Sequence, residues 1–146
     1  MMLNQELTNQ IKELFATQLI YPIMVLYFFR KNGCDTCDET SQLLDEITSL
    51  SDKLQITKYD LDENPAIAQK YNVQLTPGLV VAAGRTGELT DYGIRFAGIP
   101  SGYELGSLIH SIIMVSKRDS GLNPDVRDQL RDLKKPVQLQ VFVTPT

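Results

Sequence analysis

The two cysteines of this 146-residue chain, Cys34 and Cys37, are the residues best suited to chemistry. Two cysteines placed at random in such a chain are three positions apart only about once in 70. A thiolate near a helix N-terminus is stabilised by free N–H groups and by the helix dipole, which lowers the thiol pKa. Sulfurs one helical turn apart are close enough to form a disulfide. The pair therefore predicts thiol–disulfide exchange, with Cys34 attacking and Cys37 resolving the mixed disulfide.

Acidic residues around the pair oppose the ionisation of its thiols. Asp35, Asp38 and Glu39 raise thiol pKa values by like-charge repulsion, whereas a helix N-terminus lowers them. The sequence does not decide this balance and therefore sets no redox potential. The carboxylates of Asp38 and Asp60 could also accept a proton, although solvated surface carboxylates are the simpler interpretation.

The same spacing is also half of a zinc site, which is the main alternative for the cysteines. A four-ligand site would need two more ligands, from His110, a carboxylate or a second chain, because the chain has one histidine and two cysteines. We expect no metal and no bound cofactor, with a redox-active disulfide carrying the reaction.

A strand and a helix must position the pair. Residues 21–29 form an apolar run of strand length, which is typical of a central strand buried on both faces. Apolar residues recur with helical period over 40–50, and residues 54–61 alternate as a second strand. The cysteines therefore lie where the first strand meets the helix of a βαβ unit, whose strands are parallel with a right-handed crossover.

The remaining predicted elements complete an α/β fold. A helix over 5–19 precedes the βαβ unit, and a short helix begins at Pro65 with Asn64 as its N-cap. A hairpin of strands 79–83 and 92–97 follows, and a long helix spans 102–116. Thr76-Pro77 precedes the hairpin, and a cis bond there would turn the loop backbone toward the cysteines as an edge for an extended substrate. Only about 5–6% of X–Pro bonds are cis, so these residues alone do not decide the isomer.

Residues 20–117 resemble thioredoxin-fold oxidoreductases. The similarity is carried by the segments 58–65 (KYDLDENP), 69–73 (QKYNV) and Thr76-Pro77, which leads into the cis-proline loop of thioredoxins. The resemblance implies a cis Pro77 and a thioredoxin-like fold, with a four-stranded mixed sheet of order 2-1-3-4 flanked by helices and an extra N-terminal helix. The expected substrate-binding residues are Gly33, Asp35, Thr36, Thr76 and Pro77.

Two positions bear on proton transfer in this family. Lys58 matches a buried lysine of thioredoxins, which makes it a candidate for proton transfer. Phe28 stands where many thioredoxins have a buried aspartate that serves the inner cysteine, and a phenyl ring cannot take that role.

A narrower resemblance is to the glutaredoxin-like protein disulfide oxidoreductases, which carry two thioredoxin-fold units. It rests on the leading helix and on residues 95–104 and 135–146. The resemblance implies a thioredoxin-like domain over 1–117, a linker and short helix over 118–136, and over 137–146 the opening strand of a second unit that is absent. Bacterial alkyl hydroperoxide reductase flavoproteins have the same architecture in their N-terminal region. Their first unit usually lacks the cysteine pair, so the intact pair favours the first family.

The expected function is a cytoplasmic thiol–disulfide oxidoreductase that acts on disulfide-containing client proteins. The resemblance implies that electrons come from a flavoprotein similar to thioredoxin reductase. Two alternatives remain: a non-catalytic thioredoxin-fold docking module, and a glutathione-dependent glutaredoxin, for which Arg30 and Lys31 would be the basic residues.

Composition excludes several other classes of protein. The net charge of −4 disfavours binding to nucleic acid or to a membrane surface. Two cysteines cannot staple a secreted disulfide scaffold, and the N-terminus lacks the pattern of a signal peptide. Residues 137–143 alternate without charge, which predicts strand pairing with a sheet edge in this chain or in a neighbouring copy.

Overall fold

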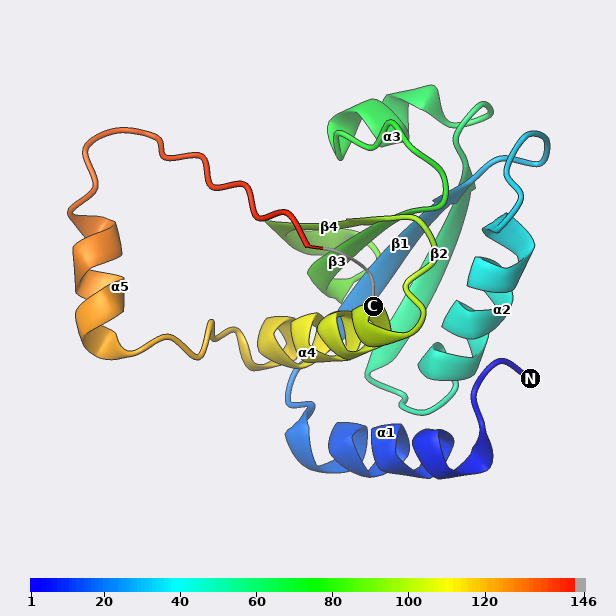
Figure 1. Ribbon diagram of the computed structural model, residues 1–146, viewed down its shortest axis with the longest axis horizontal. Helices are drawn as coiled ribbons and strands as arrows, with labels where there is room; N and C mark the ends of the chain where they lie inside the picture. The colour runs from blue at the N-terminus through cyan, green and yellow to red at the C-terminus, as the bar shows by residue number, and fades with distance from the viewer. Residues whose placement is uncertain (144–146) are drawn as a thin grey trace.

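The computed structural model describes residues 1–143 and is built around a four-stranded sheet (Figure 1). Its strands are β1 (Ile23–Phe29), β2 (Leu54–Asp60), β3 (Gly78–Arg85) and β4 (Glu88–Ala97), in the order β2-β1-β3-β4. Strands β1 and β2 are parallel, whereas β3 runs antiparallel to both β1 and β4. The predicted mixed sheet of order 2-1-3-4 is thereby confirmed.

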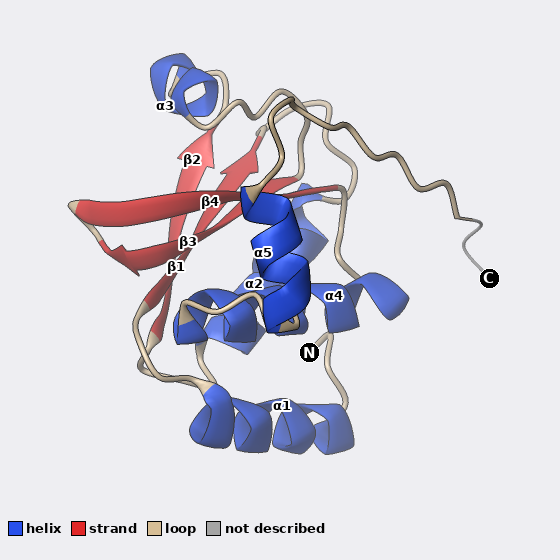
Figure 2. Ribbon diagram, turned by 90° about the vertical axis from the view of Figure 1, so that its left-hand side faces the viewer, coloured by secondary structure: helices blue, strands red, loops and turns tan. Residues whose placement is uncertain are grey.

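Five helices accompany the sheet: α1 (Gln5–Gln18), α2 (Cys37–Thr48), α3 (Pro65–Lys70), α4 (Tyr103–Lys117) and α5 (Pro124–Arg131). Helices α1, α2 and α4 contribute to one hydrophobic cluster, and α3 contributes to another on the opposite face (Figures 1 and 2). The predicted helices agree with these within a few residues.

Strand β1 is the centre of the core because both of its faces are buried. Side chains of a strand alternate between faces, so Ile23, Val25 and Tyr27 join the cluster beneath α1, α2 and α4. Phe28 belongs to the other cluster, where its ring lies 5.4 Å from the ring of Tyr59. The continuous apolar run in the sequence is therefore explained by helices on both sides of the sheet.

The β3–β4 hairpin is longer than the sequence predicts. The expected strands were 79–83 and 92–97, but pairing continues to Arg85 opposite Glu88. Gly84 makes this possible, because it has a φ of +112° and a side-chain carbon there would lie 2.0 Å from the carbonyl oxygen of Glu88. Only glycine, which has no side-chain carbon, allows β3 and β4 to pair this closely at position 84.

Arg95 forms an ion pair within β4 and a hydrogen bond to the end of α3. Two guanidinium nitrogens of Arg95 donate to the Asp91 carboxylate at 2.6 and 2.8 Å, and the third donates to the carbonyl oxygen of Tyr71 at 2.8 Å. The hydrogen bonds from Arg95 lower the pKa of Asp91 below its ordinary value of 3.8, against the opposing effect of burial, and the backbone N–H of Gly93 lowers it further.

Because the pKa of Asp91 is lowered on folding, its contribution to stability is present above the ordinary pKa and disappears as the pH falls through the folded value. We expect Asp91→Asn to lower the free energy of unfolding at neutral pH by up to about 1 kcal/mol. The difference from wild type should shrink when denaturation is measured below about pH 3.8. A constant difference from neutral to acidic pH would show that the charge of Asp91 is not the cause.

The C-terminal part of the described chain lies apart from the sheet. Helix α5 has no buried residue and stands away from the other elements in Figure 1. Residues 137–143 are exposed and form no strand, so the expected pairing within this chain is wrong over these residues, while pairing with another copy stays a prediction. Residues 144–146, the end of the predicted opening strand, lie outside the described residues. No helix within 1–143 is long and apolar enough to cross a membrane.

Candidate active site

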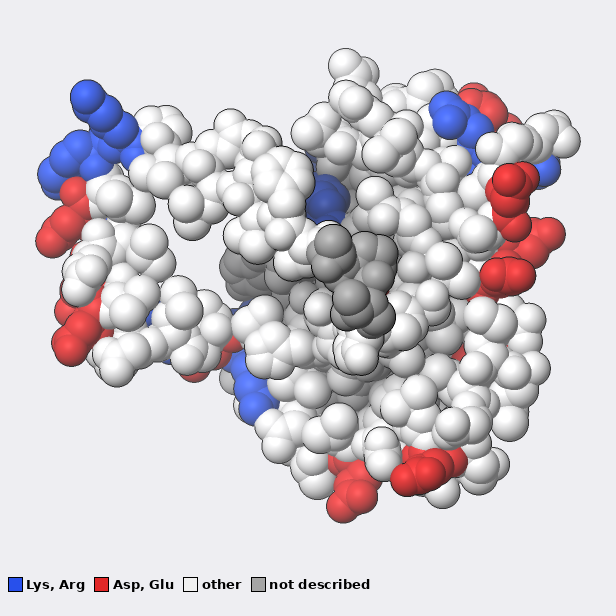
Figure 3. All heavy atoms as spheres, viewed as in Figure 1, with Lys and Arg blue, Asp and Glu red and all other residues white. Residues whose placement is uncertain are grey.

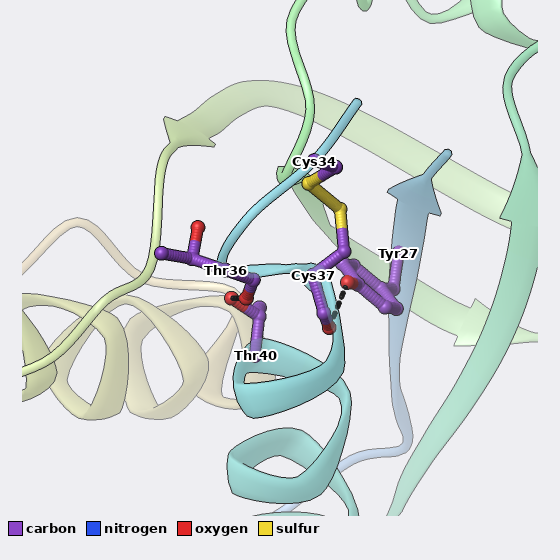
Figure 4. The surroundings of a disulfide bond; sticks show 5 residues. All are labelled: Tyr27, Cys34, Thr36, Cys37 and Thr40. Carbon is purple, nitrogen blue, oxygen red and sulfur yellow. Dashed lines mark hydrogen bonds between the residues drawn. A yellow bond between two sulfur atoms is a disulfide. The ribbon is translucent and has the colours of Figure 1, made fainter. Parts of the chain in front are cut away.

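Cys34 and Cys37 form a disulfide at the N-terminus of α2 (Figure 4). Cys34 lies in the loop that follows β1, Cys37 is the first residue of α2, and their Cα atoms are 5.5 Å apart. The structure therefore confirms that the three-residue spacing brings the two sulfurs together at a strand-to-helix junction.

The two cysteines differ in exposure. Cys37 is only 4% exposed, whereas Cys34 is half-buried and sits nearer the surface. A disulfide of another protein would therefore reach Cys34 first, and Cys37 lies where it could attack the same sulfur from inside. This asymmetry suits the predicted roles of attacking and resolving thiol.

The first turn of α2 points free backbone N–H groups toward the site. The N-cap residue Thr36 makes no side-chain capping bond. Its carbonyl oxygen accepts hydrogen bonds from the backbone N–H of Thr40 at 3.0 Å and from the Thr40 hydroxyl at 2.7 Å. The N–H groups before that position have no acceptor inside the helix and carry its partial positive charge. A thiolate at Cys34 would be stabilised by this end of the helix.

Negative charge gathers on the same edge of the molecule. Asp35, Asp38 and Glu39 are exposed, and Figure 3 shows acidic side chains over α2 and the loop before it. These carboxylates oppose thiolate formation, as the sequence predicts. Their exposure to water weakens the opposition, whereas the backbone N–H groups of α2 are fixed in place.

Ion pairs hold the loop between β1 and Cys34. Arg30 donates to Asp62 at 3.0 Å, and Lys31 pairs with Glu63 and lies 3.9 Å from the buried Asp60. The hydrogen bond and charge of Glu63 raise the pKa of Lys31. These pairs do not follow from the sequence alone, because residues 60–63 meet the loop only through the parallel pairing of β1 with β2. Both basic residues considered for glutathione binding are thus already paired.

The Thr76–Pro77 peptide bond is cis, as the resemblance implies. Gly78, the first residue of β3, pairs with Phe28 near the end of β1, so the proline loop and the cysteine loop leave the same edge of the sheet. Pro77 is buried and its carbonyl oxygen accepts the N–H of Gly98 at 2.8 Å, whereas Thr76 is half-buried. The loop therefore starts from the same edge of the sheet as the cysteine loop.

The other predicted substrate-binding residues, Gly33, Asp35 and Thr36, are exposed or half-buried. Gly33 is exposed and adopts a left-handed φ of +74°, which turns the chain into Cys34. Asp35 is exposed and Thr36 half-buried, and together with Gly33 they are the chain neighbours of the half-buried Cys34. No group of three metal-ligating side chains occurs within 1–143, and the sole histidine, His110, is exposed on α4.

Lys58 departs from the expectation. Its side chain is 33% exposed, and its ammonium donates to the Ser41 hydroxyl and to the Asp45 carboxylate, each at 2.7 Å. The implied burial of this lysine is therefore wrong. The ammonium thus contacts Ser41 and Asp45, so this geometry gives no support to proton transfer with Cys37.

Tyr27 is the site residue that the sequence analysis missed. It precedes Phe28, and the alternation of β1 places Tyr27, not Phe28, on the face covered by α2. Its hydroxyl donates to the carbonyl oxygen of Cys37 at 2.6 Å (Figure 4). Burial raises the Tyr27 pKa far above its usual range, and the charge of Asp38 raises it further. One feature of the sequence indicates such a role: Tyr27 places a hydroxyl in an apolar run, and a buried tyrosine hydroxyl usually needs a hydrogen-bond partner.

Comparison with known proteins supports the fold and the type of site. The family model described as a glutaredoxin-like domain matches residues 25–89. A component of the alkyl hydroperoxide reductase of Staphylococcus epidermidis is 30% identical over 145 residues, which are 99% of this chain and 25% of that protein. An NADH dehydrogenase of Bacillus subtilis is 29% identical over 112 residues, 77% of this chain and 19% of that protein. The chain thus spans about a quarter of the length of such relatives.

Two solved structures are similar along most of the chain. The alkylhydroperoxide reductase AhpF of Enterococcus faecalis has a TM-score of 0.79 and 26% identity, and the match covers 92% of this chain and 62% of that one. A protein disulfide oxidoreductase of Aeropyrum pernix has a TM-score of 0.76 over 90% of this chain and 55% of that one, and its 24% identity shows the fold alone.

The predicted resemblance is confirmed at this level. Residues 25–89 match a glutaredoxin-like domain, the fold is thioredoxin-like, and the chain is homologous to part of the alkyl hydroperoxide reductase AhpF, with a Cys34–Cys37 disulfide at the start of α2. The intact cysteine pair favoured the protein disulfide oxidoreductases. It does not separate this chain from the alkyl hydroperoxide reductases, which match 99% of its length.

Proposed function

We propose that this chain is a thiol–disulfide oxidoreductase that exchanges electrons with protein disulfides through Cys34 and Cys37. One observation carries the proposal: a disulfide at the N-terminus of α2 has one half-buried and one buried cysteine, at the same edge of the sheet as the loop of Thr76 and Pro77. We propose the division given by the sequence, with the site in a thioredoxin-like domain over 1–117 and residues 118–143, which are almost all exposed, outside it.

In the reducing direction, the Cys34 thiolate attacks one sulfur of a client disulfide. The client S–S bond breaks, a mixed disulfide forms, and one client thiolate leaves and takes a proton from water. The Cys37 thiolate then attacks the Cys34 sulfur and releases the second client thiolate. Two electrons pass from the pair to the client, and the Cys34–Cys37 disulfide remains. The oxidising direction is the same sequence in reverse.

The proline loop is proposed to hold the client chain. Within residues 1–143, neither the N–H nor the carbonyl group of Thr76 has a backbone hydrogen-bond partner. The residue before a proline is held extended, so these groups can pair with an extended segment of a client. Gly33, Asp35 and Thr36 would contact the client near Cys34, because they adjoin it in the chain and are exposed or half-buried.

The spent disulfide must be reduced by another protein. We propose a flavoprotein similar to thioredoxin reductase, since the relative of highest identity named above is part of an alkyl hydroperoxide reductase. The chain itself would use its disulfide and no bound cofactor. A cytoplasmic location fits this role, because a lone disulfide in a reducing compartment is more often catalytic than structural.

Glutathione-dependent chemistry is less well supported than exchange with proteins. Arg30 and Lys31, the basic residues near Cys34, are paired with Asp62 and Glu63. A glutathione carboxylate would have to displace one of these pairs. We therefore place protein disulfides first, and a role as a docking module without catalysis is the hypothesis that the experiment must separate.

The test is the reduction of insulin by dithiothreitol, followed as turbidity. We expect the wild-type chain to accelerate precipitation and Cys34→Ser to leave the rate at that of dithiothreitol alone, because the variant lacks the attacking thiolate. Circular dichroism would verify that the variant is folded. Equal rates for the wild type and the variant would support a docking module instead.

A further inference from the structure

A buried hydroxyl contacts the backbone of the resolving cysteine. We propose that Tyr27 is a positioning residue, which fixes the first turn of α2 so that the Cys37 sulfur can close the ring with Cys34. The catalytic use of this ring closure rests on the proposed function, but the closure itself is a property of the chain and can be measured without a client protein.

The ring of Tyr27 is held in place by its packing in the core. It lies in the central strand β1, is 1% exposed, and its ring stacks on that of Phe29 with centroids 5.8 Å apart. It belongs to the same hydrophobic cluster as Leu43 and Leu44 of α2. The position of the hydroxyl is therefore set by the packed sheet, and loop motion does not move it.

The hydroxyl donates to the carbonyl oxygen of Cys37 at 2.6 Å, a distance typical of a good O–H···O hydrogen bond (Figure 4). It links residues ten positions apart and joins β1 to α2. The neighbouring bonds from Thr40 to Thr36 are local, since they connect one turn of the helix to its own N-cap. Of these hydrogen bonds, only the one from Tyr27 connects the first turn of α2 to the sheet.

This anchor matters because the first turn of α2 has no side-chain cap of its own. Thr36 supplies no side-chain cap, and Cys34 and Asp35 precede the helix in an irregular loop. Resolution requires the Cys37 sulfur to reach Cys34 within a mixed disulfide, and its rate depends on how well the turn is pre-organised. The raised pKa of Tyr27 keeps its hydroxyl protonated, and so a donor, across the pH range in which thiols ionise.

The experiment compares wild type with Tyr27→Phe, which removes the hydroxyl and keeps the ring. The Cys34–glutathione mixed disulfide is prepared, and its conversion to the Cys34–Cys37 disulfide is followed by mass spectrometry. The equilibrium with a dithiothreitol redox buffer is measured in parallel. We expect ring closure to be about fivefold slower or less favourable in Tyr27→Phe, the scale of one buried hydrogen bond.

Tyr59→Phe is the matched control. Tyr59 lies on the neighbouring strand β2, packs against Phe28 on the other face of the sheet, and its hydroxyl has no hydrogen bond within residues 1–143. We expect its ring closure to equal that of wild type. An unchanged ring closure in Tyr27→Phe would overturn the inference even if its melting temperature fell, and so would equal losses in both variants.

A measurement on the wild type covers the case in which Tyr27→Phe does not fold. The hydroxyl proton of Tyr27 should exchange slowly enough to be seen by NMR in the oxidised chain, because it is buried and bonded. Exchange as fast as that of the Tyr59 hydroxyl would contradict the inference. A wild-type chain that closes its ring but fails to reduce insulin would reject the proposed function alone.

Discussion

Cys37→Ser is expected to leave the chain covalently attached to its client proteins. Cys34 can still attack a client disulfide, but the hydroxyl at position 37 cannot displace the captured sulfur, so the mixed disulfide persists. Cys34→Ser should capture little, because the remaining thiol at Cys37 is buried. Adducts from a mixture of disulfide-containing proteins would be detected on non-reducing gels and should disappear with dithiothreitol.

The double variant, with both cysteines changed to serine, is the control for non-covalent association. Capture by Cys34→Ser equal to that by Cys37→Ser would contradict the assignment of roles. Stronger capture by Cys34→Ser would reverse the assignment and make the inner cysteine the attacking group. Either result would conflict with the difference in exposure between Cys34 and Cys37.

Gly84→Ala is expected to destabilise the β3–β4 hairpin strongly. A side-chain carbon at this position would lie 2.0 Å from the carbonyl oxygen of Glu88, and the backbone has a φ of +112°. Both the overlap and the conformation are unfavourable for alanine, so we expect a loss of about 3 kcal/mol or more in the free energy of unfolding. Urea denaturation followed by circular dichroism would measure it.

Gly87→Ala separates the two causes. Gly87 lies in the same hairpin and also has a left-handed φ, +95°, but nothing is within 4 Å of a carbon added there. We expect the free energy of unfolding of Gly87→Ala to fall only by the cost of a left-handed backbone for alanine, about 1 kcal/mol. Equal losses in the two variants would show that the contact with Glu88 relaxes without cost, and the explanation for the length of the hairpin would then be wrong.

Much of the fold follows from local patterns in the sequence. The unbroken apolar run of β1 predicts a central strand, and helical periodicity after the cysteines predicts α2 and hence the site at its N-terminus. Asn64 and Pro65 mark the start of α3 as expected. The boundaries of the hairpin were less accurate, since Gly84 and Arg85 look like turn residues but pair with β4. Turn composition cannot reveal that a missing side chain permits closer pairing.

The residues that escaped prediction are those whose roles depend on contacts distant in sequence. Tyr27 looks like one more apolar residue of β1, and its role follows from the face on which α2 packs. Lys58 matches a family position, but exposure decides its chemistry, and the structure places it in an ion pair with Asp45. Strand alternation over 137–143 predicts pairing, yet a strand needs a partner that this chain does not supply within its described residues.

The central claim is that Cys34 is ionised near neutral pH because it lies at the free end of α2. The most direct test is a pH titration of the reduced chain, with thiolate absorbance and alkylation rates compared between wild type, Cys34→Ser and Cys37→Ser. We expect the thiol of Cys34 to titrate well below about 8.5, the value of an ordinary cysteine, and the thiol of Cys37 to titrate higher. A Cys34 thiol that titrates at or above about 8.5 would show that the end of α2 does not activate it.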